Sequence, residues 1–121
     1  MGNRTPDWPE YPAWSTARYF QFLRSALRGA WGRWPAKFQL LKENRRTVTG
    51  RRHKFEYMCA QCKGWFQQKE IQVDHIIPAG ALNCHEDLKG FVARLFVGVD
   101  KLQIMCKPCH KVKTKEERDA M

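Results

Sequence analysis

The chain has 121 residues, which suits one small domain with a modest hydrophobic core. It contains no run of about 18 apolar residues, which excludes a membrane-spanning helix, and its start lacks the apolar stretch of a secretory signal, so we expect a cytoplasmic protein. Lys and Arg number 22 against 12 Asp and Glu, and the formal charge of +10 favours a polyanionic partner such as nucleic acid.

The N-terminal part of the chain is predicted to be helical. Residues 1–14 hold three prolines and two tryptophans and are expected to form an irregular arm, after which Ser15 is a suitable helix N-cap. Apolar side chains then recur at three- and four-residue steps, which predicts an amphipathic helix with one face in the core. They are Phe20, Leu23, Leu27 and Trp31.

Glycine and proline predict a break in the helical pattern near residues 29–35. Pro35 suits the first turn of a second, short helix, in which Phe38 and Leu41 would face inward. Residues 44–54 are polar and basic and are expected to form a loop. We therefore divide the chain into a basic helical arm over residues 1–54 and a second module over residues 55–121.

Basic residues are concentrated between residues 24 and 54, where ten Lys or Arg accompany a single acid, Glu43. A surface that follows nucleic-acid phosphates has this composition, and so does a solvated basic face without a partner. The candidate DNA-binding residues of this segment are Arg24, Arg28, Lys37, Arg45, Arg46, Arg51, Arg52 and Lys54.

Four of the five cysteines form two CxxC pairs, Cys59 with Cys62 and Cys106 with Cys109. Each CxxC turn brings two thiolates to one metal ion, and four soft thiolates with no open position are typical of structural Zn²⁺. Without a secretory signal, cysteines favour metal binding over disulfides. Cys84 remains outside the pairs and is assigned no role.

The second module is predicted to run as strand, long loop, strand and helix. The stretch IQVDHIIPAG, from Ile71 to Gly80, has the apolar, β-branched flanks of a short strand, and Leu102 to Met105 have the same character. Residues 88–96 predict a short helix between the two strands, and Pro108 begins a helix that extends to about residue 118.

Asp74 and His75 lie within the first of these strands, where an ion pair at a strand end is the simplest interpretation. Consecutive helical residues point about 100° apart, so Cys109 can face a zinc ion while His110 faces the pocket of Asp74 and His75. A role for His110 beside the zinc is the alternative. Since adjacent strand residues point to opposite faces, we expect the strand to end or bend at Asp74 and His75, before Pro78.

The succession CAQC…VDHIIP…LQIMCKPCHKVKT, within residues 56–115, resembles the HNH endonuclease family in its zinc-stapled form, which is common among phage proteins. The N-terminal stretches SALRGAW and RWPAKFQLLK also look like phage members of this group. The resemblance implies an α+β, ββα-metal fold and metal-dependent cleavage of double-stranded DNA, in the host cytoplasm if the chain is phage-encoded.

The resemblance also implies residue roles. His75 matches the general base, and Asp74 and His110 match the ligands of a catalytic Mg²⁺, Mn²⁺ or Ni²⁺ ion, with 5′-phosphate and 3′-hydroxyl products. By their position beside His110 on the predicted helix, Lys111, Lys113, Thr114 and Lys115 are further candidates for contacts with DNA phosphates, and a solvated helix face is the alternative for the last two.

This chain departs from the family at the middle Asn, where it has Lys101, preceded by Asp100. A lysine cannot accept a hydrogen bond, so either Asp100 braces the loop or the loop is held differently, and Lys101 is then a candidate for a phosphate contact. The alternative functions are a non-catalytic, zinc-ribbon-like module that binds nucleic acid and a zinc-stapled adaptor for other proteins. His53 and His85 are expected to be loop residues.

Overall fold

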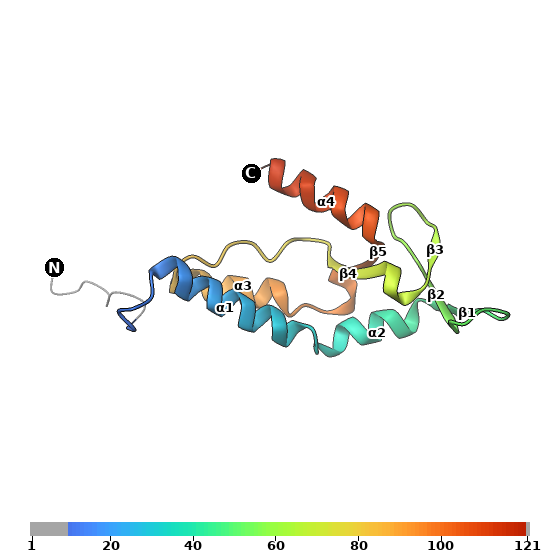
Figure 1. Ribbon diagram of the computed structural model, residues 1–121, viewed down its shortest axis with the longest axis horizontal. Coiled ribbons are helices and arrows are strands. Elements are labelled where there is room, and N and C mark those ends of the chain that lie inside the picture. Colours follow the sequence, from blue (N-terminus) through green and yellow to red (C-terminus); the bar gives the residue numbers. More distant parts are fainter. Residues whose placement is uncertain (1–9, 121) are drawn as a thin grey trace. The chain divides into compact units, whose positions relative to one another are not determined.

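The computed structural model describes residues 10–120, which form four α-helices and two small antiparallel sheets, an α+β fold as predicted (Figure 1). Residues 10–14 form turns and bends, and the rest of the predicted irregular arm lies outside the described residues. Among the described residues, no helix has the length and apolar character needed to cross a membrane.

The packing of the chain defines two compact units. Among the described residues, one comprises residues 10–33 together with Ala79–Phe96, and the other comprises Trp34–Pro78 together with residues 97–120. We placed a boundary after residue 54, where the helical pattern gives way to the cysteines and short strands. The two compact units do not follow this boundary. The difference arises because the loop between the two predicted strands packs with the first helix.

The first unit is built on α1 (Thr16–Trp31) and α3 (Leu88–Leu95), with a short 3-10 turn, η2 (His85–Asp87), before α3. The hydroxyl of Ser15 accepts a hydrogen bond from the Arg18 backbone N–H at 3.1 Å, which confirms Ser15 as the N-cap of α1. The predicted apolar face of α1 packs in a core with α3, and this core consists of Phe20, Ala79, Leu82, Phe91 and Leu95, with Leu23, Leu27 and Trp31 against it.

The second unit begins with α2 (Pro35–Glu43), which starts at Pro35 as predicted. Leu41 is buried as expected, but the expected inward position of Phe38 is wrong, because its side chain is 52% exposed. The neighbouring position Leu40, one residue before Leu41, is the second buried residue of this helix. The apolar face of α2 therefore lies over Leu40 and Leu41.

A three-stranded sheet follows α2, formed by β1 (Arg45–Thr47), β2 (Phe55–Met58) and β3 (Trp65–Phe66). The prediction of a loop throughout residues 44–54 is wrong at β1, which pairs antiparallel with β2 from Arg45 opposite Tyr57 to Thr47 opposite Phe55. β1 has no apolar alternation, and its strand conformation depends on its partner strand.

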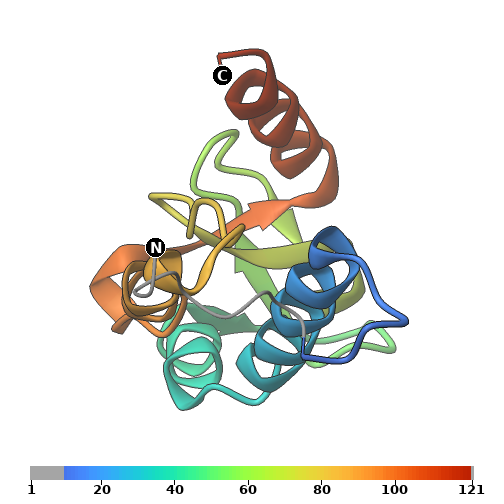
Figure 2. The ribbon, with the colours of Figure 1, turned by 90° about the vertical axis from the view of Figure 1, so that its left-hand side faces the viewer.

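The two-stranded sheet joins β4 (Ile71–His75) and β5 (Leu102–Cys106) antiparallel, and α4 (Lys107–Asp119) begins directly after β5 (Figures 1 and 2). Short 3-10 turns precede the two strands, η1 (Gln68–Glu70) before β4 and η3 (Val99–Lys101) before β5. The predicted order of strand, long loop, strand and helix is confirmed. α4 contacts both strands of this sheet, so residues on its inner face lie close to β4.

Candidate metal centres

The four cysteines of the two CxxC pairs come together in the second unit. Their sulfur atoms all lie within 4.8 Å of one another, and the sulfurs of Cys62 and Cys106 are 3.9 Å apart. Zn–S bonds of about 2.3 Å in a tetrahedron place the sulfurs about 3.8 Å apart. The donor set and its spacing therefore fit a structural metal ion such as zinc.

The first CxxC pair lies in a tight turn between β2 and β3. The Cys59 N–H donates to the Gly64 carbonyl at 2.9 Å, and the Cys62 N–H points at the Cys59 sulfur at 3.5 Å. Lys63 has a φ of 64°, in the left-handed region that L-residues rarely adopt. A Cβ atom on Gly64 would lie 2.9 Å from the ring of Phe66, so a larger residue there would displace that ring.

The thiols of the cluster differ in acidity. Burial opposes ionisation of Cys59, but hydrogen bonds from the backbone at Cys106 and Cys62 outweigh it and lower its pKa to about 6. The neighbouring Cys106 thiol raises the pKa of Cys109 to about 12, and burial raises the pKa of Cys106. Without a metal the cluster therefore ionises readily at Cys59, whereas Cys106 and Cys109 keep their protons until a cation replaces them.

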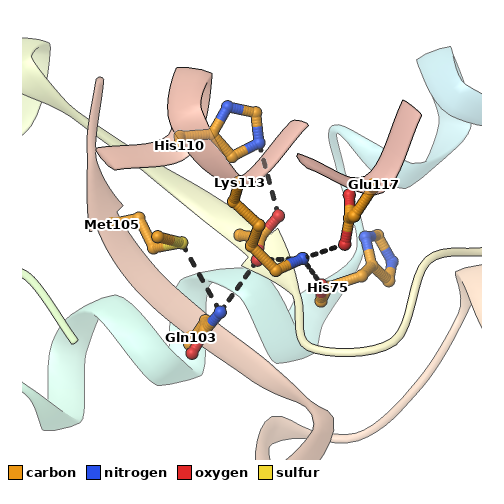
Figure 3. Close-up of polar contacts among 7 residues, drawn as sticks. His75, Gln103, Met105, His110, Lys113 and Glu117 are labelled. Atoms are coloured by element: carbon orange, nitrogen blue, oxygen red, sulfur yellow. Dashed lines mark hydrogen bonds and ion pairs between the residues drawn. The ribbon is translucent and has the colours of Figure 1, made fainter. Parts of the chain in front are cut away.

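A second polar centre surrounds Asp74, which is 8% exposed and lies next to the last residue of β4. Its Oδ1 atom is 3.3 Å from Nε2 of His110, and its Oδ2 atom accepts from Gln103 Nε2 at 2.9 Å and lies 3.1 Å from Lys113 Nζ (Figure 3). Gln103 is the direct partner of Asp74 in β5, and His110 and Lys113 are three residues apart on α4. Sheet register and helix periodicity together assemble the centre.

Lys113 is the cation of this centre. Its ammonium group also donates to the His75 carbonyl at 3.0 Å and to the Glu117 carboxylate (Figure 3). Partial burial alone would lower the pKa of Lys113, but the hydrogen bonds to Glu117 and Asp74 outweigh it and raise that pKa. Lys113 is therefore charged at neutral pH and neutralises part of the acidic charge around it.

His75 is the last residue of β4, so the strand ends before Pro78, but the expectation that Asp74 and His75 would share one pocket is wrong, because both residues are still paired with β5. His75 nevertheless remains paired with Leu102, and the Ile76 N–H extends the pairing by donating to the Lys101 carbonyl at 3.1 Å. The side chains of adjacent strand residues alternate between faces. In Figure 3 the His75 imidazole accordingly projects away from His110.

The sequence therefore placed six groups of these centres correctly as neighbours, namely the four cysteines of one centre and Asp74 and His110 of the other. It did not reveal Gln103 or Glu117, and it assigned Lys113 to DNA phosphate and not to Asp74. The signal for Lys113 and Glu117 was their spacing, three and seven residues after His110, which places them on one face of a helix. Lys111 is exposed on α4. The residues at the predicted bracing positions, Asp100 and Lys101, lie in η3, where the backbone carbonyl of Lys101 accepts a hydrogen bond from the Ile76 N–H.

Two of the candidate DNA-binding arginines belong to the first unit and contact its core. Arg24 donates to the Leu82 carbonyl at 2.6 Å, and the Arg28 guanidinium lies 5.6 Å from the centre of the Phe91 ring. In this unit His85 also has a partner, the Tyr19 hydroxyl, at 2.8 Å. Arg24 thus has a structural role that the charge pattern did not predict.

The other basic candidates belong to the second unit, and several surround the β1–β2 hairpin. The guanidinium groups of Arg45 and Arg46 lie 3.8 Å from the centre of the Phe55 ring and 4.0 Å from that of Trp65, respectively. Arg46 also binds Glu56 at 2.8 Å. Arg51, Arg52 and Lys54 are exposed in the connection between the two strands, and Lys37 lies 5.8 Å from the centre of the Phe38 ring on α2.

Glu56 holds the base of this hairpin. Its buried carboxylate accepts from His53 at 3.0 Å and from Arg46, and these hydrogen bonds, that of His53 first, lower the pKa of Glu56. His53 is therefore part of the hairpin's hydrogen-bond network around Glu56 rather than of a metal centre.

Comparison of the chain with protein-family models, with curated proteins and with solved structures found no match.

Proposed function

We propose that the protein is a metal-dependent HNH-type endonuclease that nicks or cleaves double-stranded DNA, with a divalent ion held by Asp74 and His110. The distance of 3.3 Å between Asp74 Oδ1 and His110 Nε2 is the observation that carries the proposal. Two donors about 2.1 Å from an octahedral ion and at right angles lie about 3.0 Å apart. The pair therefore needs only a small adjustment to share one ion.

The donor types agree with this proposal. One carboxylate oxygen and one imidazole nitrogen suit Mg²⁺, Mn²⁺ or Ni²⁺, and such ions keep positions for water and for a substrate phosphate. When bound, the ion supplies charge stabilisation at the scissile phosphate and at the leaving 3′ oxygen. Gln103, which donates to Oδ2 at 2.9 Å, holds the Asp74 carboxylate in the orientation that presents Oδ1 to His110.

His75 has a different role in the proposal. Its imidazole takes a proton from the attacking water, for which a free pKa near neutrality suits it. The water oxygen attacks phosphorus and the 3′ oxygen leaves, so the products carry 5′-phosphate and 3′-hydroxyl ends. The proposal requires the attacking water to lie within hydrogen-bond reach of the His75 imidazole, although Asp74 and His75 project from opposite faces of β4.

When it holds a zinc ion, the four-cysteine cluster helps to position the residues of the centre at Asp74. Cys106 is the last residue of β5 and Cys109 lies in the first turn of α4, directly before His110. A metal that joins these cysteines to Cys59 and Cys62 fixes the start of α4 against the sheet. It thereby fixes the position of His110 relative to Asp74.

The basic residues of the second unit supply the DNA contacts in this proposal. Arg51, Arg52 and Lys54 are exposed in the hairpin connection, and Lys111 is exposed beside His110. The same residues are the observation that favours the second candidate, a non-catalytic zinc-ribbon-like module that binds nucleic acid. The contact between Asp74 and His110 distinguishes the two functions, because a binding module does not need it.

A plasmid assay tests the proposal. The zinc-loaded protein is incubated with supercoiled plasmid and Mg²⁺, Mn²⁺ or Ni²⁺, or with EDTA, and nicked and linear products are separated. We expect cleavage that requires a divalent ion and stops with EDTA, and the nicked-to-linear ratio will identify the mode of cutting. Plasmid that is bound but remains supercoiled with all three ions would establish the binding module instead.

A further inference from the structure

Lys113 places a positive charge on the carboxylate of Asp74, at the oxygen beside the one proposed to bind the ion. Its Nζ atom lies 3.1 Å from Asp74 Oδ2 and 3.0 Å from the His75 carbonyl oxygen, and it also donates to Glu117 Oε2. Only 20% of the Lys113 side chain is exposed, and 9% of the Asp74 side chain. This ammonium group is therefore held by three oxygen acceptors in a partly desolvated position (Figure 3).

Such an arrangement stabilises Asp74 in the absence of a divalent ion. A buried carboxylate without a positive partner is unfavourable, and Lys113 supplies that partner within the fold. A divalent ion that binds Asp74 brings two positive charges close to the ammonium group that already neutralises this carboxylate. At a separation of a few ångströms in a poorly solvated site, like charges repel strongly.

We propose that Lys113 is a built-in counter-ion that competes with the divalent ion for Asp74 and thereby sets the metal affinity of the centre. The inference rests on the proposed ion site at Asp74 and His110. The Lys113 ammonium group moves away from Asp74 when the ion binds. The centre therefore binds a divalent ion more weakly than the same ligands would without the lysine.

Glu117 makes this exchange feasible. It lies four residues after Lys113 on α4, a spacing at which helical side chains meet, and it already accepts from the ammonium group. After its displacement from Asp74, Lys113 retains an acidic partner. The ammonium group therefore remains paired at the edge of the centre in both states.

Binding of Mn²⁺ to the zinc-loaded protein, followed by the electron paramagnetic resonance signal of free Mn²⁺, tests the inference without any activity measurement. We expect Lys113→Met to tighten Mn²⁺ binding at least about tenfold, because one competing charge is removed from the carboxylate. Lys113→Gln, which retains a donor for Asp74 without the charge, should do the same and guards against misfolding of the methionine variant. Lys115→Met removes the same charge from an exposed position on α4 and should change the affinity less than about twofold, because solvent and salt screen it.

The outcomes separate this inference from the proposed ion site. Mn²⁺ binding that is lost in Asp74→Asn but equal or weaker in both Lys113 variants would overturn the competition and leave the ion site intact. Binding that is unaffected by Asp74→Asn, or that is absent from the wild type and both Lys113 variants, would overturn the ion site and the inference with it. Binding that appears only when Lys113 is replaced would support the competition directly.

Discussion

His110 Nε2 lies 3.3 Å from Asp74 Oδ1, and the residue directly before His110 is Cys109, a member of the four-cysteine cluster. The first turn of α4 thus contributes to two centres at once. Cys109 faces the sulfur cluster, whereas His110 faces the buried carboxylate of β4. This arrangement predicts that the centre at Asp74 can be disabled while the four-cysteine cluster keeps its metal.

We predict that His110→Ala weakens the binding of the divalent ion while the four-cysteine cluster keeps its metal. The imidazole is one of two proposed ligands, and its loss should raise the Mn²⁺ concentration needed for half-maximal cleavage at least about tenfold. Zinc content, measured by atomic absorption after gel filtration, should remain at the wild-type level. Release of zinc together with loss of cleavage would show that Cys109 and His110 do not act independently.

Metal binding by the cysteine cluster should depend on pH. The pKa values of Cys106 and Cys109 lie above the ordinary thiol value, that of Cys109 at about 12, so both thiols are protonated at pH 7 and zinc must displace their protons. Cys59, with a pKa lowered to about 6, is already largely ionised there. We therefore expect zinc affinity to rise with pH across the neutral range.

Calorimetry in buffers of different ionisation enthalpy measures this effect. Zinc binding at pH 7 should release at least about two protons, one for each of the thiols with a raised pKa. A cluster that binds zinc with no proton release would contradict the assigned ionisation states.

Gly64, in the turn after the first CxxC pair, is expected to affect the stability of the fold. Gly64→Ala should destabilise the zinc-loaded protein by about 1–3 kcal/mol, because the added methyl group would lie 2.9 Å from the ring of Phe66. Gly29→Ala is the matched control, since no atom lies within 4 Å of its added methyl group and it occupies a helical position. The free energy of unfolding, measured with urea, should rise by about 0.5–1 kcal/mol in the control. An equal decrease of this free energy in both variants would refute the steric argument.

Contacts of the basic residues predict which ones serve DNA binding. Arg51→Gln combined with Arg52→Gln should weaken binding and reduce the slope of log affinity against log salt by about one for each lost phosphate contact. Arg24→Gln should lower thermal stability instead, because Arg24 donates to the Leu82 carbonyl at 2.6 Å. Fluorescence anisotropy on a DNA duplex at several salt concentrations checks the first result. A salt slope that is unchanged by the double substitution would remove the hairpin from the DNA-binding surface.

The elements with strong local signals were predictable from the sequence. Ser15, Pro35 and Pro108 mark helix starts through capping and fixed backbone angles, and the apolar periodicity of α1 follows from its core face. The spacing of the two CxxC pairs likewise predicted a common cluster, because four thiolates bind one metal ion regardless of the surrounding fold.

Features that depend on pairing between distant segments were not predictable. β1 consists of polar residues and becomes a strand through β2 and through the bond between Arg46 and Glu56. Gln103 reaches Asp74 only because the two residues are opposite each other in the register of β4 and β5. The burial of Lys113 likewise follows from the placement of α4 against the sheet, which a charged helix sequence does not reveal.

The most direct test of the proposed function is the cleavage rate of His75→Ala on supercoiled plasmid, with plasmid binding measured in parallel. His85→Gln, in the first unit, is the control for loss of an imidazole, since a glutamine amide can still bond the Tyr19 hydroxyl. We predict that His75→Ala binds plasmid as the wild type does but cleaves it about 10²–10⁴-fold more slowly, the usual contribution of a general base. Cleavage by His75→Ala at the wild-type rate would contradict the assignment of His75 as the base.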